Sequence, residues 1–162
     1  MSKAILISIK PKWVAKILNG EKNIEIRKRF PKDYVGWVYI YCTKDKKYAN
    51  LINRGGFLTG MVVARFWCGK VEKIRSYLEP EQWYMTSDLG GSGLLKKSCL
   101  SFKELDNYLL SGDGYAIHIT NLEIFDRPKE ISEFKHLTCR NCKTQIVRQL
   151  THTPQSWCYI EV

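Results

Sequence analysis

The sequence lacks a long hydrophobic run, a secretory segment and any internal repeat. None of its 162 residues belongs to a stretch approaching the roughly 18 apolar residues that a helix needs to cross a bilayer. The apolar segment at residues 4–9 is too short for a signal peptide and has no cleavage site of small residues. These absences exclude a membrane-spanning or secreted class, and we expect a cytoplasmic protein in which residues 1–162 form one domain.

Acidic residues are scarce relative to basic ones. The chain has 26 Lys and Arg residues against 16 Asp and Glu residues, which gives a formal net charge of +10. Basic surfaces attract polyanions, because each phosphate contact releases counterions. Aromatic residues make up 12% of the chain, and unpaired bases stack on aromatic rings. RNA or a nucleotide is therefore the expected partner, and the alternative is that the charge serves solubility alone.

The segment from Gly20 to Arg29 holds the densest group of charges. Within it, Ile24 and Ile26 alternate with Glu25 and Arg27, which predicts a strand with one buried face. The same spacing directs both charged side chains to one side, where they could pair with each other or with a ligand. An edge strand whose outer face is only solvated and salt-bridged is the structural alternative.

Three segments carry a family resemblance. They read Ser-Ile-Lys-Pro-Lys-Trp at 8–13, Gly-Glu-Lys-Asn-Ile-Glu-Ile-Arg at 20–27 and Pro-Gln-Ser-Trp-Cys-Tyr at 154–159. In these motifs the chain resembles the ASCH domain, a branch of the PUA-like superfamily, of the phage and bacterial type. The resemblance implies an α+β fold, namely a small and mostly antiparallel β-barrel of about five to seven strands with two to four short helices.

In PUA-like domains, the cleft between the barrel and the helix after the first strand receives RNA or a nucleoside. By resemblance, the ligand-binding side chains would be Lys10, Trp13, Lys22, Glu25, Arg27, Arg29 and Trp157. The cations would bind phosphate, and the tryptophans would stack on a base unless they belong to the core. The resemblance thus favours a nucleic-acid-binding module that recognises RNA or a modified nucleotide.

The family also includes small amidohydrolases that deacetylate acetylcytidine with a lysine, a threonine and a glutamate. Lys22 matches the lysine, but Glu25 stands in the place of the threonine, and no glutamate lies near Lys97 and Ser98. Other ASCH proteins are associated with RNA cleavage, so the enzyme alternative is a ribonuclease or nucleoside amidohydrolase with Lys22 and Glu25 as catalytic groups. A third hypothesis is a phage accessory or protein-interaction domain whose cleft is closed by a Glu25–Arg27 pair.

The six cysteines are expected to be reduced, because no secretory segment is present. Three of them, Cys42, Cys68 and Cys99, lie in apolar stretches typical of a core. An insertion at about 136–152 contains a Cys-x-x-Cys motif, and a structural zinc would be held by Cys139, Cys142, His152 and Cys158. No other cofactor is expected, and the oligomeric state is expected to be a monomer or a weak homodimer.

The hydrophobic pattern predicts strands at 4–9, 24–27, 37–43, 57–67, 70–74, 114–125 and 157–162. Helices are expected from Pro11 to Leu18, from Glu79 to Met85, and after the capping box formed by Ser101 and Glu104. A short helix or loop is expected at 44–54, a flexible glycine loop at 90–93, and a connection at 127–137. His118 alternates with apolar strand residues and is interpreted as a hydrogen-bonded histidine.

Overall fold

The computed structural model describes residues 2–47, 59–79, 82–140 and 144–162. Most of the segment expected at 44–54, and the start of the strand expected at 57, therefore lie outside the described residues. The chain groups into two compact units, each built from separate stretches of sequence. Unit 1 comprises Met1–Leu18, Gly36–Trp67 and Asn121–Val162, and unit 2 comprises Asn19–Val35 and Cys68–Thr120.

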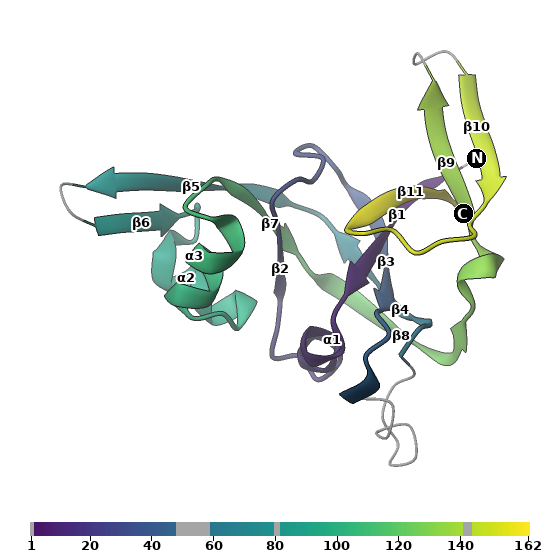
Figure 1. Ribbon diagram of the computed structural model, residues 1–162, viewed down its shortest axis with the longest axis horizontal. Helices are drawn as coiled ribbons and strands as arrows, with labels where there is room; N and C mark the ends of the chain where they lie inside the picture. Colours follow the sequence, from purple (N-terminus) through teal and green to yellow (C-terminus); the bar gives the residue numbers. More distant parts are fainter. Residues whose placement is uncertain (1, 48–58, 80–81, 141–143) are drawn as a thin grey trace. The chain divides into compact units, whose positions relative to one another are not determined.

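Unit 1 is built on a seven-stranded sheet whose strand order is β10-β9-β11-β1-β3-β4-β8 (Figure 1). The strands are β1 (Lys3–Ile9), β3 (Gly36–Cys42), β4 (Val62–Cys68), β8 (Thr120–Lys129), β9 (Lys135–Arg140), β10 (Thr144–Gln149) and β11 (Trp157–Glu161). The first strand lies between β3, to which it is parallel, and β11, to which it is antiparallel. A 3-10 helix, η2 (Ile131–Glu133), precedes β9.

Apolar side chains on one face of this sheet form the core of unit 1. Ala4 and Leu6 of β1 pack there with Tyr39 and Tyr41 of β3 and with Ile160 of β11. The single α-helix described in this unit, α1 (Pro11–Leu18), begins at a proline and buries one face, which includes Val14 and Ile17.

Unit 2 is built on a four-stranded antiparallel sheet with the order β2-β7-β5-β6. The strands are β2 (Ile24–Arg27), β5 (Val71–Glu79), β6 (Gln82–Thr86) and β7 (Gly114–His118). Two helices, α2 (Gly90–Ser98) and α3 (Phe102–Leu109), pack against the sheet (Figure 1). Their contacts are made by Leu94, Leu105 and Leu109, which meet Ile24 and Ile26 of β2, Ile74 of β5 and Ala116 of β7.

The expected α+β class is confirmed, and the described residues contain three α-helices, within the expected number. They also contain eleven strands in two sheets, more than the resemblance implied, and the described pairings do not close either sheet into a barrel. None of the described helices is long and apolar enough to cross a membrane.

Two element predictions are wrong, and two are correct in part. The helix expected from Glu79 to Met85 is not present: within the described residues this segment is the end of β5 and most of β6, which pair from Glu79↔Gln82 to Arg75↔Thr86. The expected glycine loop at 90–93 is the first turn of α2. The strand expected at 114–125 is divided at Ile119 into β7 and β8, which belong to different sheets. The expected connection at 127–137 contains the end of β8, η2 and the start of β9.

Candidate functional site

Three charged side chains are buried on β2 and on the turn that precedes it. Lys22 is 2% exposed, Glu25 4% and Arg27 9%. The alternation predicted a strand with one buried face, but all four residues of β2 are buried. Both faces of the strand are therefore covered, and the charged side chains need partners within the protein.

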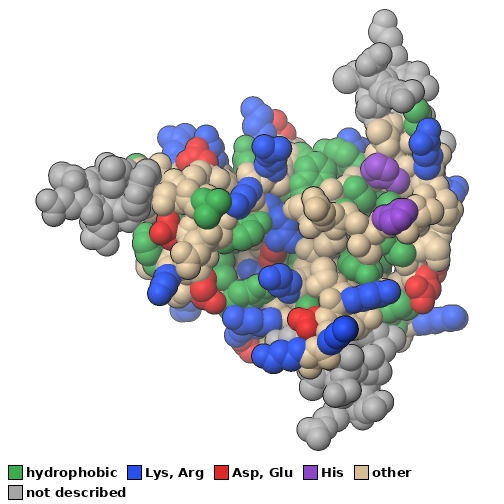
Figure 2. Space-filling model, in the orientation of Figure 1, with side chains coloured by type: hydrophobic (Ala, Val, Ile, Leu, Met, Phe, Trp, Pro, Cys, Tyr) green, Lys and Arg blue, Asp and Glu red, His purple; other side chains and the backbone are tan. Residues whose placement is uncertain are grey.

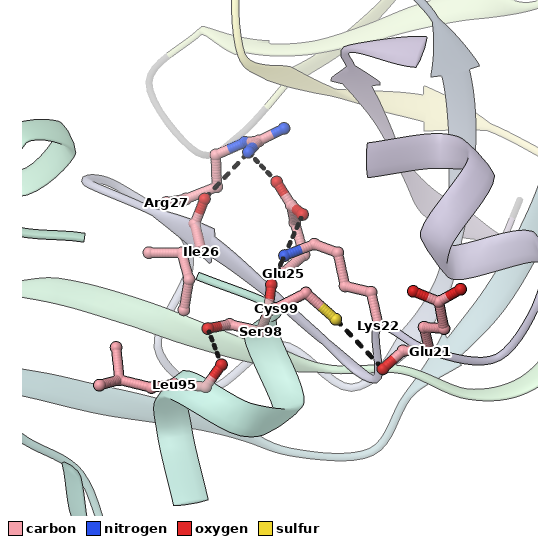
Figure 3. A network of polar contacts seen from close by, with 8 residues as sticks. All are labelled: Glu21, Lys22, Glu25, Ile26, Arg27, Leu95, Ser98 and Cys99. Atoms are coloured by element: carbon pink, nitrogen blue, oxygen red, sulfur yellow. Dashed lines mark hydrogen bonds and ion pairs between the residues drawn. The ribbon is translucent and has the colours of Figure 1, made fainter. Parts of the chain in front are cut away.

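Lys22 joins the start of β2 to the end of α2 (Figure 3). Its Nζ donates a hydrogen bond to the backbone oxygen of Ser98, the last residue of α2, at 2.7 Å. A second hydrogen bond runs from the backbone nitrogen of Asn23 to the oxygen of Lys97, at 2.9 Å. An ammonium group at a helix C-terminus satisfies a free carbonyl and the negative end of the helix dipole, so this position also has a structural explanation.

Glu25 lies between the two cations. The Nζ of Lys22 is 3.4 Å from Oε2 of Glu25, and Nη1 of Arg27 donates a hydrogen bond to the other carboxylate oxygen. Nη1 of Arg27 also donates to the backbone oxygen of Ile26 at 2.9 Å. The sequence left open whether Glu25 and Arg27 pair with each other or with a ligand, and in the structure they pair with each other. Because the interaction-domain hypothesis requires the same pair, the pair alone does not separate that hypothesis from ligand binding.

Burial lowers the pKa of Lys22, and the charge of Glu25 only partly opposes this effect. A lysine whose pKa is lowered can exchange a proton closer to neutral pH than an exposed lysine does. The arrangement can therefore supply a proton-transfer group beside a guanidinium that recognises oxygen atoms.

Cys99 lies next to Lys22, Glu25 and Arg27 (Figure 3), and the sequence did not predict this position for Cys99. It caps α2 in a left-handed conformation (φ 57°), and its Sγ contacts the backbone oxygen of Glu21 at 3.3 Å. The expected core positions of Cys42 and Cys68 are confirmed, whereas Cys99 is only half-buried. The turn after α2 exposes it, and an apolar local sequence cannot reveal such a turn.

The remaining predicted ligand-binding residues lie elsewhere in the chain. Lys10 and Arg29 are exposed, and Trp13 on α1 and Trp157 on β11 are half-buried. The Trp157 ring packs edge-on against Tyr159, with 5.3 Å between the ring centroids. Lys10, Trp13 and Trp157 belong to unit 1, whereas Lys22, Glu25, Arg27 and Arg29 belong to unit 2. Their convergence on one ligand stays a prediction.

The proposed zinc ligands lie on or near the β9–β10 hairpin and β11. Cys142 and the side chain of Cys139 lie outside the described part of the structure. His152 is exposed, and burial raises the pKa of Cys158 to about 11. Among the side chains that the structure describes, no three potential metal ligands come together. Structural zinc stays a prediction.

A second buried charge is present in unit 2, at Glu72 on β5. Its Oε1 accepts hydrogen bonds from Nε2 of His118 at 2.7 Å and from Nζ of Lys70 at 2.9 Å. Burial alone would raise the pKa of Glu72, but the contacts with Lys70 and His118 outweigh burial and lower it. The hydrogen-bonded role predicted for His118 is confirmed. Its partner was missed because it depends on the register between β5 and β7.

Comparison with known proteins identifies the fold through solved structures and not through the sequence. No protein-family model matches the sequence, and no curated protein is significantly similar to it. The structure, however, has the fold of crystal structures of ASCH proteins. This likeness confirms the ASCH fold that the sequence motifs implied.

Three of the similar structures are of an ASCH protein from Zymomonas mobilis. Its ASCH protein is 16% identical, with a TM-score of 0.60 over 98% of this chain and 87% of that one. A variant with tyrosine replaced by phenylalanine is 15% identical, with a TM-score of 0.61 over 99% and 91% of the two chains. A variant with serine replaced by alanine is 16% identical, with a TM-score of 0.60 over 98% and 88%. These TM-scores show a shared fold, but at identities this low the activity of this chain must be argued from its own residues.

Proposed function

We propose that this chain is a nucleic-acid-binding module of ASCH type that binds single-stranded RNA at Lys22, Glu25 and Arg27. The observation that carries the proposal is the burial of these three charged residues together, none more than 9% exposed. Removing an ion from water costs several kcal/mol, even when the ion is paired. Buried ionisable groups with shifted pKa values are concentrated at functional sites.

Exposed cations lie on the segments that flank this cluster. Lys28 and Arg29 directly follow β2, and Lys96 and Lys97 occupy the last turn of α2, which hydrogen bonds attach to the start of β2. Figure 2 shows Lys and Arg side chains over much of the visible face, with acidic ones interspersed. The exposed cations would bind phosphates, and the guanidinium of Arg27 would bind a base or phosphate oxygen.

The test is RNA binding by Lys22→Met, which removes the charge and keeps most of the aliphatic stem. Fluorescence anisotropy with a labelled single-stranded RNA pool at low salt should show binding by the wild type and at least about tenfold weaker binding by the variant. Lys103→Met on the exposed surface of α3 is the matched control and should bind within about twofold of the wild type. Absence of wild-type binding at low salt would refute the proposal.

A hydrolase is the second candidate, and the lowered pKa of Lys22 favours it. Once deprotonated, the amine of Lys22 could act as a general base, with Arg27 stabilising negative charge on the substrate. Incubation of the same RNA with a chelator and analysis of product size would test this candidate. Loss of products with a folded Lys22→Met variant would assign the base to Lys22, and unchanged products would exclude that role.

A further inference from the structure

Glu72, His118 and Lys70, here called the Glu72 cluster, have the geometry of an organised acid–base pair. The Glu72 side chain is 1% exposed, and its Oε1 accepts hydrogen bonds from both His118 and Lys70. Its Oε2 is buried and has no hydrogen-bond partner among the described residues. The cluster joins β5 to the end of β7, so the backbone of a regular sheet holds it in place.

The lowered pKa of Glu72 determines which imidazole nitrogen carries the proton. The carboxylate is ionised at neutral pH and can only accept a hydrogen bond, so Nε2 of His118 must be the donor. In the neutral imidazole, Nδ1 then carries the free lone pair. The imidazole is 21% exposed, and no hydrogen bond to Nδ1 is present within the described residues. A carboxylate that fixes the tautomer of a partly exposed histidine is the arrangement of a general base.

A cation stands beside this base. Nζ of Lys70 contacts the same oxygen of Glu72 at 2.9 Å, so the ammonium and the imidazole are close neighbours. The Lys70 side chain is 54% exposed and also contacts Asp88 at 3.3 Å. The residue opposite His118 on β2 is Ile24, which adds no charge. An exposed ammonium next to a base is suited to a substrate that carries an anionic group beside a hydroxyl.

The cluster also lies at the same end of β2 as Lys22. His118 pairs with Ile24, and the backbone nitrogen of Ile119 donates to the oxygen of Asn23 at 3.0 Å. Asn23 is the immediate neighbour of Lys22 in the sequence. A strand of RNA bound at Lys22 could therefore continue toward His118 and Lys70.

We propose that His118 is a catalytic general base for cleavage of single-stranded RNA, positioned by Glu72, with Lys70 binding the phosphate at the cleaved bond. This inference rests on the proposed function, since it requires RNA to bind. Nδ1 takes the proton of a 2′-hydroxyl, and the 2′-oxygen attacks the adjacent phosphorus. The bond from phosphorus to the 5′-oxygen breaks, and the departing oxygen takes a proton from water. The imidazolium returns its proton to the hydroxide that remains, which leaves a 2′,3′-cyclic phosphate and a 5′-hydroxyl.

The experiment is cleavage of labelled single-stranded RNA in the presence of a chelator, with binding measured in parallel. His118→Gln should lower the cleavage rate at least about 100-fold and leave RNA affinity within about threefold. His136→Gln is the matched control, because His136 lies on β9 and contacts only Thr138 among described hydrogen-bond partners. It should cleave at the wild-type rate.

The positioning role of Glu72 has its own readout. The amide of a glutamine can present either its oxygen or its NH2 group to Nε2, so Glu72→Gln no longer fixes the tautomer of His118 and should lower kcat at least about tenfold while RNA affinity stays within about threefold. Glu72→Asp should restore part of the rate. Lys70→Ala should raise KM more than it lowers kcat.

The outcomes separate the two proposals. Wild-type protein that binds RNA and leaves it intact overturns this inference and leaves the proposed function standing. Wild-type protein that does not bind RNA overturns both. Cleavage that persists in folded His118→Gln, or products with a 5′-phosphate, also overturns the role of His118.

Discussion

At the scale of single residues, Glu25 keeps two buried cations compatible with the folded state. Its replacement by alanine would leave Lys22 and Arg27 buried near each other without their shared counter-ion. We expect Glu25→Ala to lower the free energy of unfolding by about 3–5 kcal/mol, measured by urea denaturation at pH 7. The exposed Glu21 provides the control, since Glu21→Ala should cost about 1 kcal/mol or less. Equal losses in the two variants would show that the Glu25 pairs contribute little.

The pKa of Lys22 predicts how stability depends on pH. Burial lowers this pKa below 10.5, so between the lowered value and 10.5 the unfolded chain binds more protons than the folded one. Stability conferred by the wild-type lysine must therefore rise with pH across that interval. We expect the difference in unfolding free energy, wild type minus Lys22→Met, to increase from pH 7 to pH 10 in urea denaturation. A difference that is independent of pH would mean that the pKa of Lys22 is not lowered.

At the scale of elements, helices α1 and α3 were predicted correctly because their sequences contain residues that favour a helix start. Pro11 begins α1, and Ser101 with Glu104 forms the capping box of α3, in which Ser101 Oγ accepts from the Glu104 nitrogen at 3.2 Å. Ser101→Ala should lower the free energy of unfolding by about 1 kcal/mol, because the first turn of α3 loses its N-cap hydrogen bond. Thermal denaturation would measure this loss, and Ser101→Asp, which can still accept the hydrogen bond, should recover most of it.

The wrong predictions concern elements fixed by distant contacts. Gly90 and Gly91 suggested a loop, yet Gly90 has a φ of +71°, and a Cβ on Gly91 would lie 3.1 Å from the Met85 oxygen. The glycines thus allow α2 to begin and to approach β6, while Leu94 anchors the helix in the core. A helix was expected from Glu79 to Met85 because Pro80 can begin a helix. The aromatic and β-branched residues of β6 favour a strand instead, and a strand is what forms.

The candidate site was predicted only where its contacts lie within one strand, and contacts between distant segments were missed. The period of β2 correctly put Glu25 and Arg27 within reach of each other, because that relation lies within one strand. Burial of β2 and its charged residues depends on residues far along the sequence, such as Leu94 and Ser98. The contact between Glu72 and His118 crosses two strands 46 residues apart, and a single sequence contains no signal for it.

At the scale of the whole molecule, the net charge of +10 makes a prediction about salt. If about three phosphates are contacted, RNA affinity should fall at least about tenfold between 50 and 200 mM salt, as each contact releases counterions. Anisotropy titrations over this range would give the slope of log K against log salt. An affinity independent of salt would mean that the basic surface does not contact phosphates.

The pairing of β1 with β11 has a consequence for how the chain is made. These strands join Lys3 to Glu161, and the backbone nitrogen of Val162 donates to the oxygen of Ser2 at 3.0 Å. During synthesis on the ribosome, β1 must wait for β11, which follows every other described strand in the sequence, whereas all described strands of the second sheet have been made by His118. The contact between Ser2 and Val162 also makes this stretch of chain, residues 2–162, a suitable subject for circular permutation. A short linker could join them, and new ends opened in an exposed turn would allow β11 and β1 to be synthesised one after the other.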